Sequence, residues 1–321
     1  MRKENFRNIA IIAHVDHGKT TLVDGLLKQS GTFQDHQEIE DRVMDSMDLE
    51  KERGITITAK NTAINYNDIK INIMDTPGHA DFGGEVERSL NLVDGALLLV
   101  DSSEGPLPQT RFVLKKALEK DLPIILVINK IDRADARIEE VIDEVYDLFI
   151  DLDANENQIE FPIIYTNAKS GIAHTSLDKE SKNLEPLFET ILSEINGPLA
   201  DDNEEAQFLV TSLDYDSYVG QIAIGRLTSG KLKMSENYAL CAEDKIEHNH
   251  KFSALYTFDG LKRVQVDQVE AGDIIAIAGI DGLTIGDTIS DNEVPSALPR
   301  IMVDEPTVSM LFYVNDSPFA G

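Results

Sequence analysis

The chain has 321 residues, a length that predicts two domains, and its 42% hydrophobic and 27% charged residues are typical of a globular protein. Its net charge of −29 argues against a general nucleic-acid binder, because non-specific binding to nucleic acid depends on Lys and Arg. No apolar run approaches the roughly 20 residues of a membrane span, so no membrane partner is expected. The single cysteine, Cys241, permits no internal disulfide, which favours a reducing, cytoplasmic location.

The first 200 residues alternate short apolar runs with helical patterns. The predicted strands are Asn8–Ala13, Ile69–Met74, Gly95–Val100 and Ile124–Ile128. The predicted helices are Lys19–Gln29, Gly84–Leu92, Gln109–Lys120, Ile138–Asp151 and Leu184–Asn196. Uninterrupted apolar strands are typical of sheets that are covered on both faces. This alternation therefore predicts an α/β fold with a doubly wound, mainly parallel sheet.

The pattern changes at the Gly/Pro/acidic linker Gly197–Asn203. Short strand patterns and turns follow, among them FLVTSLDY, QIAIGRLTSG, RVQVDQV and DIIAIAG, and they predict a small closed β-barrel. Pro295 and Pro299 mark a second linker, and Val308–Val314 begins one more strand. We therefore expect domains at 1–200 and 201–294. Residues 295–321 would hold a linker and the first strand of a third domain in a longer protein.

The first candidate site is the stretch AHVDHGKT, Ala13–Thr20, which differs from the phosphate-binding pattern G-x-x-x-x-G-K-[ST] only at its first residue. A predicted strand precedes it and a predicted helix follows, so backbone N–H groups would converge on a phosphate at the positive end of the helix. Lys19 is expected to reach the β- and γ-phosphates, and Thr20 to ligate Mg²⁺. The residues predicted to surround the phosphates are His14, Val15, Asp16, His17, Gly18, Lys19, Thr20 and Thr21.

Ala13 stands where the pattern has glycine. It requires only that the backbone there avoid positive φ, where alanine is disfavoured. Two other interpretations of this stretch stay open when it is taken alone. One is a chance glycine-lysine turn, and the other is a metal site formed by His14, Asp16 and His17.

The motif DTPGH, Asp75–His79, follows the second predicted strand. A carboxylate at the end of a strand can hold Mg²⁺ through water, and the Gly78 N–H can approach a γ-phosphate closely. By itself the motif could also be an Asp-initiated turn. Its position after a strand favours a ligand-binding role, because ligands of open α/β sheets bind at the carboxyl ends of the strands.

Two more motifs follow strands. NKID, Asn129–Asp132, offers an aspartate that can accept hydrogen bonds from guanine N1–H and N2–H₂, a donor pair that adenine lacks. Asn167, Ala168 and Lys169 follow the strand pattern FPIIYT, where a backbone N–H could bind guanine O6. Taken alone, each motif could also be a turn or loop that binds no ligand. Together and in this order, the four segments predict a site for a guanine nucleotide.

These residues resemble those of the translational GTPases. The resemblance is carried by AHVDHGKTTL, ERGITI, DTPGHADF and NKID, and by the barrel segments GRLTSGKL and EAGDI. Within that elongation factor G-like superfamily, the long stretches DTPGHADFGGEVERSLNLVDGALLLVDSSEGPLPQTRFVLKKAL and DEPTVSMLFYVNDSPFAG are most similar to the BipA/TypA type. The resemblance covers the whole chain, although proteins of this type are longer. Ala13 matches the loop of this branch, whereas Asn167 departs from the family's usual serine.

The resemblance implies a role for each matching residue. Asp132 and Asn129 would read guanine, with Lys130 along the ring. Thr20 would bind Mg²⁺ directly, joined by Thr56 in the GTP state, and Asp75 would act through water. His79 would orient the attacking water, and Val15 and Ile55 would form an apolar gate before it. Asp16 would hold a monovalent cation or an RNA phosphate. The implied catalytic residues are His79, Lys19, Thr56 and Asp16, and Arg53 is a weak candidate for an arginine finger.

The expected function is therefore a ribosome-associated, stress-related GTPase that switches between GTP and GDP, slow alone and stimulated by ribosomal RNA. We expect a monomer, with ppGpp as a further candidate ligand. The alternatives are an elongation factor G-like or LepA-like translocation factor, and a binding module in which hydrolysis is incidental. A P-loop kinase or ATPase is disfavoured by NKID. Residues 30–59 are expected to form a first switch that stays open without a γ-phosphate.

Overall fold

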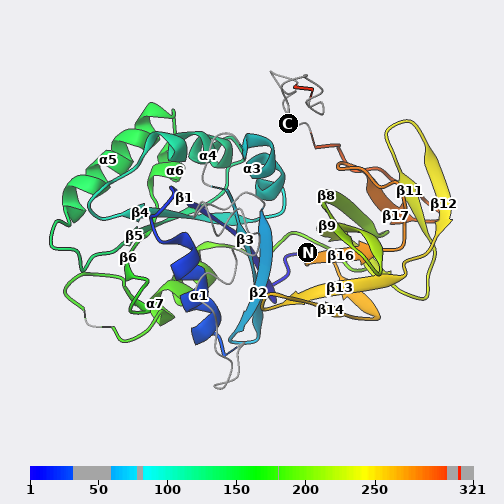
Figure 1. Ribbon diagram of the computed structural model, residues 1–321, viewed down its shortest axis with the longest axis horizontal. Coiled ribbons are helices and arrows are strands. Elements are labelled where there is room, and N and C mark those ends of the chain that lie inside the picture. Colours follow the sequence, from blue (N-terminus) through cyan, green and yellow to red (C-terminus); the bar gives the residue numbers. More distant parts are fainter. Residues whose placement is uncertain (32–58, 78–81, 180, 302–309, 312–321) are drawn as a thin grey trace, which may run out of the picture.

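The computed structural model of the chain describes residues 1–31, 59–77, 82–179, 181–301 and 310–311, which form two units side by side (Figure 1). The first unit contains a seven-stranded sheet in the order β2-β3-β1-β4-β5-β6-β7. Its strands are β1 (Phe6–Ala13), β2 (Lys60–Tyr66), β3 (Ile69–Asp75), β4 (Gly95–Asp101), β5 (Ile124–Asn129), β6 (Ile163–Asn167) and β7 (Ile172–His174). The central five strands are parallel, and β2 and β7 are antiparallel edges.

Helices cover both faces of this sheet. Those described are α1 (Lys19–Gln29), α3 (Gly83–Leu90), α4 (Pro108–Glu119), α5 (Ile138–Asp151), α6 (Glu156–Ile159) and α7 (Glu185–Glu194). One apolar core lies under α1 and α7, and the other lies under α3, α4 and α5. The strands β1, β4 and β5 are buried along their whole length, as expected for strands covered on both sides. The predicted doubly wound, mainly parallel α/β sheet is confirmed.

The second unit is built from antiparallel strands. Eight of them form a sheet in the order β12-β11-β17-β8-β9-β16-β13-β14, and β10 pairs with β15. Their bounds are β8 (Gln207–Asp216), β9 (Gly220–Ser229), β10 (Lys231–Lys233), β11 (Tyr238–Cys241), β12 (Ile246–His250), β13 (Ala254–Asp259), β14 (Lys262–Gln265), β15 (Gln268–Glu270), β16 (Ile274–Ala278) and β17 (Thr288–Asp291). The inward-facing side chains form a separate apolar core. The predicted all-β character of this unit is confirmed.

The sequence pattern missed several elements. The edge strand β2 alternates poorly, since only the three residues Thr62–Ile64 of its seven are buried. The segment RVQVDQV, predicted as one strand pattern, forms β14 and β15, which belong to different sheets. The predicted strand Val308–Val314 lies mostly outside the described residues. In the part of the chain that is described, no helix is long and apolar enough to cross a membrane.

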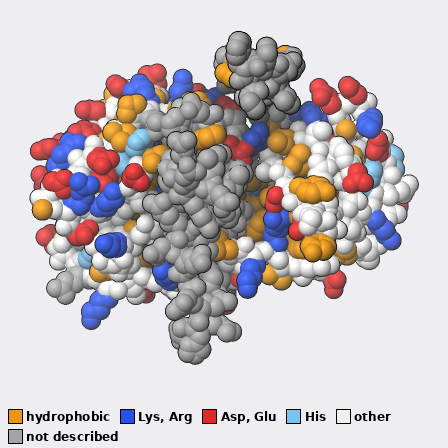
Figure 2. Space-filling view, viewed as in Figure 1, with side chains coloured by type: hydrophobic (Ala, Val, Ile, Leu, Met, Phe, Trp, Pro, Cys, Tyr) orange, Lys and Arg blue, Asp and Glu red, His pale blue; other side chains and the backbone are white. Residues whose placement is uncertain are grey.

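The surface carries charges of both signs. On the face shown in Figure 2, acidic and basic side chains are interspersed over both units. Many charged side chains of the described residues are paired, for example Arg137 with Glu144 beside α5 and Arg263 with Asp214 in the second unit. Exposed ion pairs of this kind contribute little to stability, typically less than about 1 kcal/mol each.

Candidate functional site

The predicted site segments meet at one edge of the first sheet. The strands β1, β3, β5 and β6 run parallel, so the residues that follow their carboxyl ends lie along the same edge. These are the segments after Ala13, at Asp75, after Asn129 and at Asn167. Crevices at this edge are the usual ligand sites of open α/β sheets.

The loop between β1 and α1 has the backbone that a phosphate loop needs. Gly18 caps α1 with a φ of +97°, a left-handed conformation that favours glycine. A Cβ at Gly18 would lie 2.4 Å from the Asn129 Nδ2, so a side chain there would also collide with the neighbouring loop. Ala13 is absent from the residues with positive φ, so alanine is compatible with its place at the end of β1.

Lys19 and Asp75 form a buried ion pair between the start of α1 and the end of β3. The Lys19 Nζ lies 2.8 Å from the Asp75 Oδ1, with side-chain exposures of 9% and 0%. The same ammonium donates a hydrogen bond to the Thr76 carbonyl. The Thr76 hydroxyl donates to the Ile11 carbonyl at 2.7 Å, which fixes the chain just after β3 against β1.

Two of the predicted magnesium ligands lie among the described residues. Thr20 is predicted to bind the ion directly, and Asp75 is predicted to bind it through water. Thr20 is the second residue of α1, and its hydroxyl has no hydrogen-bond partner among the described residues. Asp75 is fully buried at the end of its strand. Hydroxyl and carboxylate oxygens are the ligands that Mg²⁺ prefers, so the chemistry of these two side chains fits that ion.

His17 is a buried part of the phosphate loop. Its Nδ1 lies 3.4 Å from both the Leu99 carbonyl oxygen and the Asp101 backbone N, and its Nε2 lies 3.5 Å from the Glu104 Oε2. Burial lowers the pKa of His17, and the Leu99 carbonyl opposes this only partly. Both ring nitrogens therefore have protein neighbours, which supports the phosphate-loop interpretation over a metal site in this stretch.

Asn129 joins three loops of the site. Its Nδ2 donates to the His17 carbonyl at 2.8 Å, and its Oδ1 accepts from the Ala168 N–H and the Thr166 hydroxyl, both at 3.0 Å. Because its side chain is almost fully buried and holds these groups, Asn129 fixes the loops after β1 and β6 relative to β5.

A cleft of about 660 Å³ opens beside these loops. Its lining includes eight of the predicted nucleotide-binding residues, Gly18, Thr21, Asn129, Lys130, Asp132, Asn167, Ala168 and Lys169. His14, Val15, Asp16, His17, Lys19 and Thr20 do not line it. The carboxylate of Asp132 is exposed to this cleft and makes no hydrogen bond or ion pair within the described part of the chain. It is therefore available to a ligand.

Asp101, at the end of β4, is a site residue that the sequence interpretation missed. It is fully buried, and its Oδ2 lies 2.7 Å from the Lys130 Nζ and 3.4 Å from the Arg133 NH1. Burial raises the pKa of Asp101, but hydrogen bonds from Lys130 and Ser103 outweigh it and lower the pKa to about 2. Its signal in the sequence is a carboxylate directly after an apolar strand, the same signal that marked Asp75.

In the predicted base-binding segment Asn167–Lys169, some of the polar groups already have partners within the protein. The Ala168 N–H already donates to Asn129, and the Asn167 Oδ1 accepts from the Ser170 N–H at 3.1 Å. The Lys169 N–H has no acceptor among the described residues. Within this segment it is the backbone donor available to a base in the cleft. The predicted site residues Thr56, Gly78 and His79, together with Arg53 and Ile55, lie outside the described residues.

Two known domains match the sequence. The elongation factor Tu GTP binding domain matches residues 4–197, and elongation factor Tu domain 2 matches residues 220–290. A crystal structure of a protein from Thermus thermophilus superimposes with a TM-score of 0.70 at 18% identity, covering 95% of this chain and 57% of that one. At this identity the likeness concerns the fold alone.

The chain is also similar to proteins named large ribosomal subunit assembly factor BipA. It is 53% identical over 319 residues to the one from Bacillus subtilis, covering 99% of this chain and 52% of that protein. It is 54% identical over 315 residues to the one from Synechocystis sp., covering 98% of this chain and 53% of that protein. The chain thus spans about half the length of these relatives. With a matching GTP-binding domain over more than half of its residues, the chain belongs to the translational GTPases, and within that family it is similar to BipA.

Proposed function

We propose that this chain is the nucleotide-binding part of a ribosome-associated GTPase that acts as a switch in translation or in assembly of the large ribosomal subunit. The observation that carries the proposal is the free Asp132 carboxylate in the cleft, beside a phosphate loop whose backbone fits only glycine at Gly18. An acceptor in that place selects guanine over adenine. The names of the similar BipA proteins support the ribosomal role and its place in assembly.

The proposed binding roles follow from the contacts. Asp132 and the Lys169 N–H bind the edge of guanine, and the stem of Lys130, whose ammonium is held by Asp101, lies along the ring. Asn129 holds the surrounding loops in place. The loop His14–Thr21 surrounds the phosphates, and Lys19 exchanges Asp75 for a phosphate oxygen.

The proposed chemistry is hydrolysis of GTP. Thr20, Thr56 and, through water, Asp75 would hold Mg²⁺, which would supply positive charge against the charge that develops on the phosphates. His79 orients the attacking water, Val15 and Ile55 keep it away in the resting state, and Asp16 holds a monovalent cation or an RNA phosphate. Phosphoryl transfer depends mainly on such positioning and charge stabilisation. Because the sequence offers no obvious arginine finger, we propose slow hydrolysis that ribosomal RNA stimulates.

The remaining proposals concern the whole protein. The nucleotide-binding domain comprises residues 1–200 and the β-domain residues 201–294, and residues 295–321 lead into a third domain. The protein is a cytoplasmic monomer that responds to stress, with ppGpp as an additional ligand. Anchoring on the ribosome depends on segments of the longer protein, because the net charge of −29 on this chain disfavours binding to RNA.

The proposal is tested first by competition. A fluorescent GDP analogue bound to the chain should be displaced by GTP and not by equal concentrations of ATP. Efficient displacement of the GDP analogue by ATP would contradict guanine selectivity and would favour a P-loop kinase or ATPase instead. Co-sedimentation of the longer protein with ribosomal particles in GTP and in ppGpp then identifies the particle. Association with translating ribosomes alone would favour the translocation-factor alternative.

The catalytic part is tested by a two-by-two comparison of this chain and the longer protein, each with and without ribosomes, repeated for His79→Ala. An interaction made only in the transition state lowers turnover and leaves affinity unchanged. His79→Ala should therefore bind GTP normally and lose stimulated hydrolysis by a factor of about 10² or more. The 321-residue chain should stay near its basal rate. Strong stimulation of this chain would disprove the need for the missing segments, and lost GTP affinity in His79→Ala would disprove a purely catalytic role.

A further inference from the structure

The second unit reaches the strand that carries Asp75 through a buried polar network. The Lys70 Nζ on β3 lies 2.8 and 2.7 Å from the two carboxylate oxygens of Asp273 and 2.6 Å from the Thr257 hydroxyl. The Asn72 Nδ2, two residues further along β3, donates to the Asp273 Oδ1 at 3.0 Å. Lys70 and Asp273 have side-chain exposures of only 15% and 7%. Such a shielded pair constrains geometry strongly, because breaking it leaves an uncompensated buried charge.

A second contact holds the turn after α3. The Arg226 NH2 on β9 lies 2.9 Å from the Asp94 Oδ1, and its NH1 donates to the Leu92 carbonyl at 3.3 Å. Asn8 on β1 connects the two contacts, since its Nδ2 donates to the Asp94 Oδ2 and its Oδ1 accepts from Asn72, both at 2.8 Å. The strand that ends at Asp75 and the turn that follows α3 are thus both tied to the second unit.

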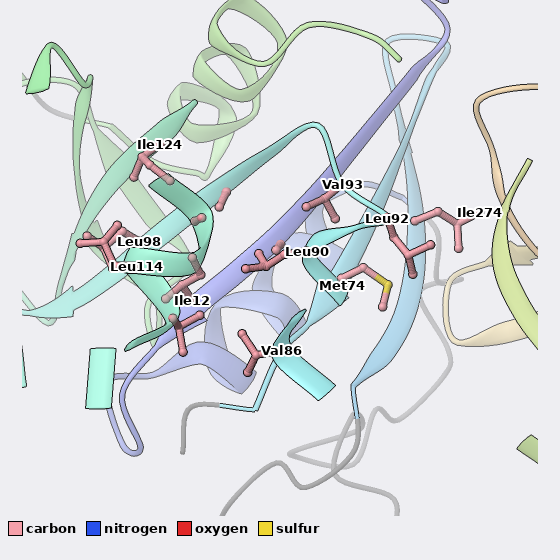
Figure 3. Packing of buried hydrophobic residues seen from close by; sticks show 14 of the residues in the cluster. Ile12, Met74, Val86, Leu90, Leu92, Val93, Leu98, Leu114, Ile124 and Ile274 are labelled. Carbon is pink, nitrogen blue, oxygen red and sulfur yellow. The ribbon is translucent and has the colours of Figure 1, made fainter. Parts of the chain in front are cut away.

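Apolar packing reinforces these polar contacts. The core under α3, α4 and α5 continues into the second unit, where its members are Ile222, Ala254, Phe258, Ile274, Ala276 and Ala278. Figure 3 shows Ile274 beside Leu92, with Met74 of β3 and Val93 close to them. Because cores are packed as densely as organic crystals, a shift at this interface cannot be absorbed locally.

The edge of the first sheet is held as well. The Ala63 N–H donates to the Gly260 carbonyl at 3.1 Å, and the Gly260 N–H donates to the Ala63 carbonyl at 2.7 Å. The Thr62 hydroxyl also donates to the Gly260 carbonyl, at 2.6 Å. The turn between β13 and β14 therefore pairs with β2, the strand that lies next to β3.

We propose that Asp273 and Arg226, both in the second unit, are positioning residues of the nucleotide site. Asp273 fixes β3, whose last residue is Asp75, and Arg226 fixes the chain that follows α3. Together they hold β3 and the turn after α3 in place, and neither Asp273 nor Arg226 lines the cleft. This inference rests on the proposed function, because it concerns how the same site binds GTP and Mg²⁺.

The coupling is reciprocal. If contacts in the second unit change the affinity for GTP, then GTP changes the affinity of a partner that binds the second unit by the same factor. The second unit would then respond to whether GTP is bound in the first unit. Substitutions along such a connection typically change coupling by about 2- to 30-fold.

The test compares two Asp→Asn substitutions at two contacts between the units. Asp273→Asn breaks the pair with Lys70 on β3. Asp202→Asn removes the ion pair with Lys3, which also joins the units but lies ahead of β1. The amide oxygen of Asn can still accept the hydrogen bond that Asp202 accepts from the Ala271 N–H at 3.1 Å, so the chain before Asp273 keeps this contact. Both variants should lose stability in urea. Below the onset of unfolding, Asp273→Asn should weaken GTP binding in Mg²⁺ about 2- to 30-fold. It should also speed hydrogen exchange in residues 70–77, while Asp202→Asn leaves both unchanged.

Equal effects of the two variants on GTP affinity and on exchange would overturn the proposal, since the contacts would then only hold the units together. Arg226→Gln gives a second, independent measurement if Asp273→Asn does not fold. It should weaken GTP binding, and Arg226→Lys, which keeps the charge beside Asp94, should recover part of the loss. Failure of the unsubstituted chain to bind GTP would instead disprove the proposed function.

Discussion

The ammonium of Lys19 and the carboxylate of Asp75 form an ion pair across 2.8 Å, with both side chains buried. In the proposed function, each of these groups has a different partner once a nucleotide binds. Lys19 would turn to the phosphates, and Asp75 would serve Mg²⁺ through water. A nucleotide that arrives without Mg²⁺ would draw Lys19 away from the buried Asp75 carboxylate and bring a second negative charge close to it, which is costly. Nucleotide and Mg²⁺ should therefore bind cooperatively.

The first prediction follows from this exchange. Asp75→Asn removes the competing charge, so a fluorescent GDP analogue should bind more tightly in EDTA than it binds to the unsubstituted chain. The gain in affinity on adding Mg²⁺ should shrink by about tenfold or more, which corresponds to about 1.4 kcal/mol. Titrations of both proteins with and without Mg²⁺ measure this. Asp132→Asn is the control, because it should weaken binding equally in both conditions. An unchanged magnesium effect in Asp75→Asn would show that the pair does not compete with the nucleotide.

The second prediction concerns base selectivity. Asp132→Asn replaces an acceptor pair with an amide, so the preference should move from GTP towards xanthosine triphosphate. The loss of GTP affinity should be about 2–5 kcal/mol, the usual cost of truncating one side of a buried charged hydrogen-bond pair. Asp135→Asn is the matched control, since Asp135 pairs with Arg133 on the same loop and does not line the cleft. Competition titrations with the two triphosphates measure the shift. Undiminished GTP affinity in Asp132→Asn would falsify the assignment.

Much of the architecture was predictable because buried parallel strands leave continuous apolar runs. The runs at β1, β3, β4 and β5 were recognisable, and each ended near a polar motif. The strand β12 was not recognisable, since all five of its residues are exposed or only partly buried at the edge of a sheet. Edge strands lack the two-sided burial that produces a clear pattern.

The contacts between the units were the part of the site that sequence patterns could not supply. Asn8 and Asn72 are polar residues in mostly apolar strands, and nothing nearby in the sequence indicates that they meet Gly272 and Asp273. Their partners are about 200 residues or more away in the chain. A buried amide is satisfied only by tertiary structure, so its partner becomes visible only when both units are placed.

The third prediction isolates the steric part of the phosphate loop. Gly18→Ala would introduce both an unfavourable φ and a collision with the Asn129 side chain. Gly220→Ala, in the second unit, shares the positive φ of +79° but meets no atom within 4 Å. Both variants should lose about 1 kcal/mol of stability or more, because alanine disfavours this backbone. Only Gly18→Ala should also weaken nucleotide binding, by tenfold or more. Thermal unfolding and GDP titration separate the two effects, and normal GDP affinity in Gly18→Ala would mean that the loop rearranges without cost.

The last prediction is a dependence of stability on pH that arises at His17. Burial lowers the pKa of His17, whereas in the unfolded chain it has the ordinary value near 6.5. The groups around the ring are His14, Asp101, Glu104 and the Leu99 carbonyl. As the pH falls below 6.5, His17 therefore becomes protonated in the unfolded chain while it stays neutral in the folded chain. The free energy of unfolding should decrease by up to about 1.4 kcal/mol per pH unit from this group until its folded-state pKa is reached.

This contribution is measured by urea unfolding between about pH 7.5 and 5.5, where histidine titrates. His17→Gln should be less stable than the unsubstituted chain at the upper end, because the ring fills a buried space between the phosphate loop and the end of β4. Its stability should then fall less steeply with pH, so the difference between the two proteins should narrow towards pH 5.5. His248→Gln, which alters an exposed histidine in the second unit, should leave the slope of the unsubstituted chain intact. A slope that His17→Gln does not change would mean that the folded protein accepts the proton at this ring, with Glu104 at 3.5 Å as its counter-charge.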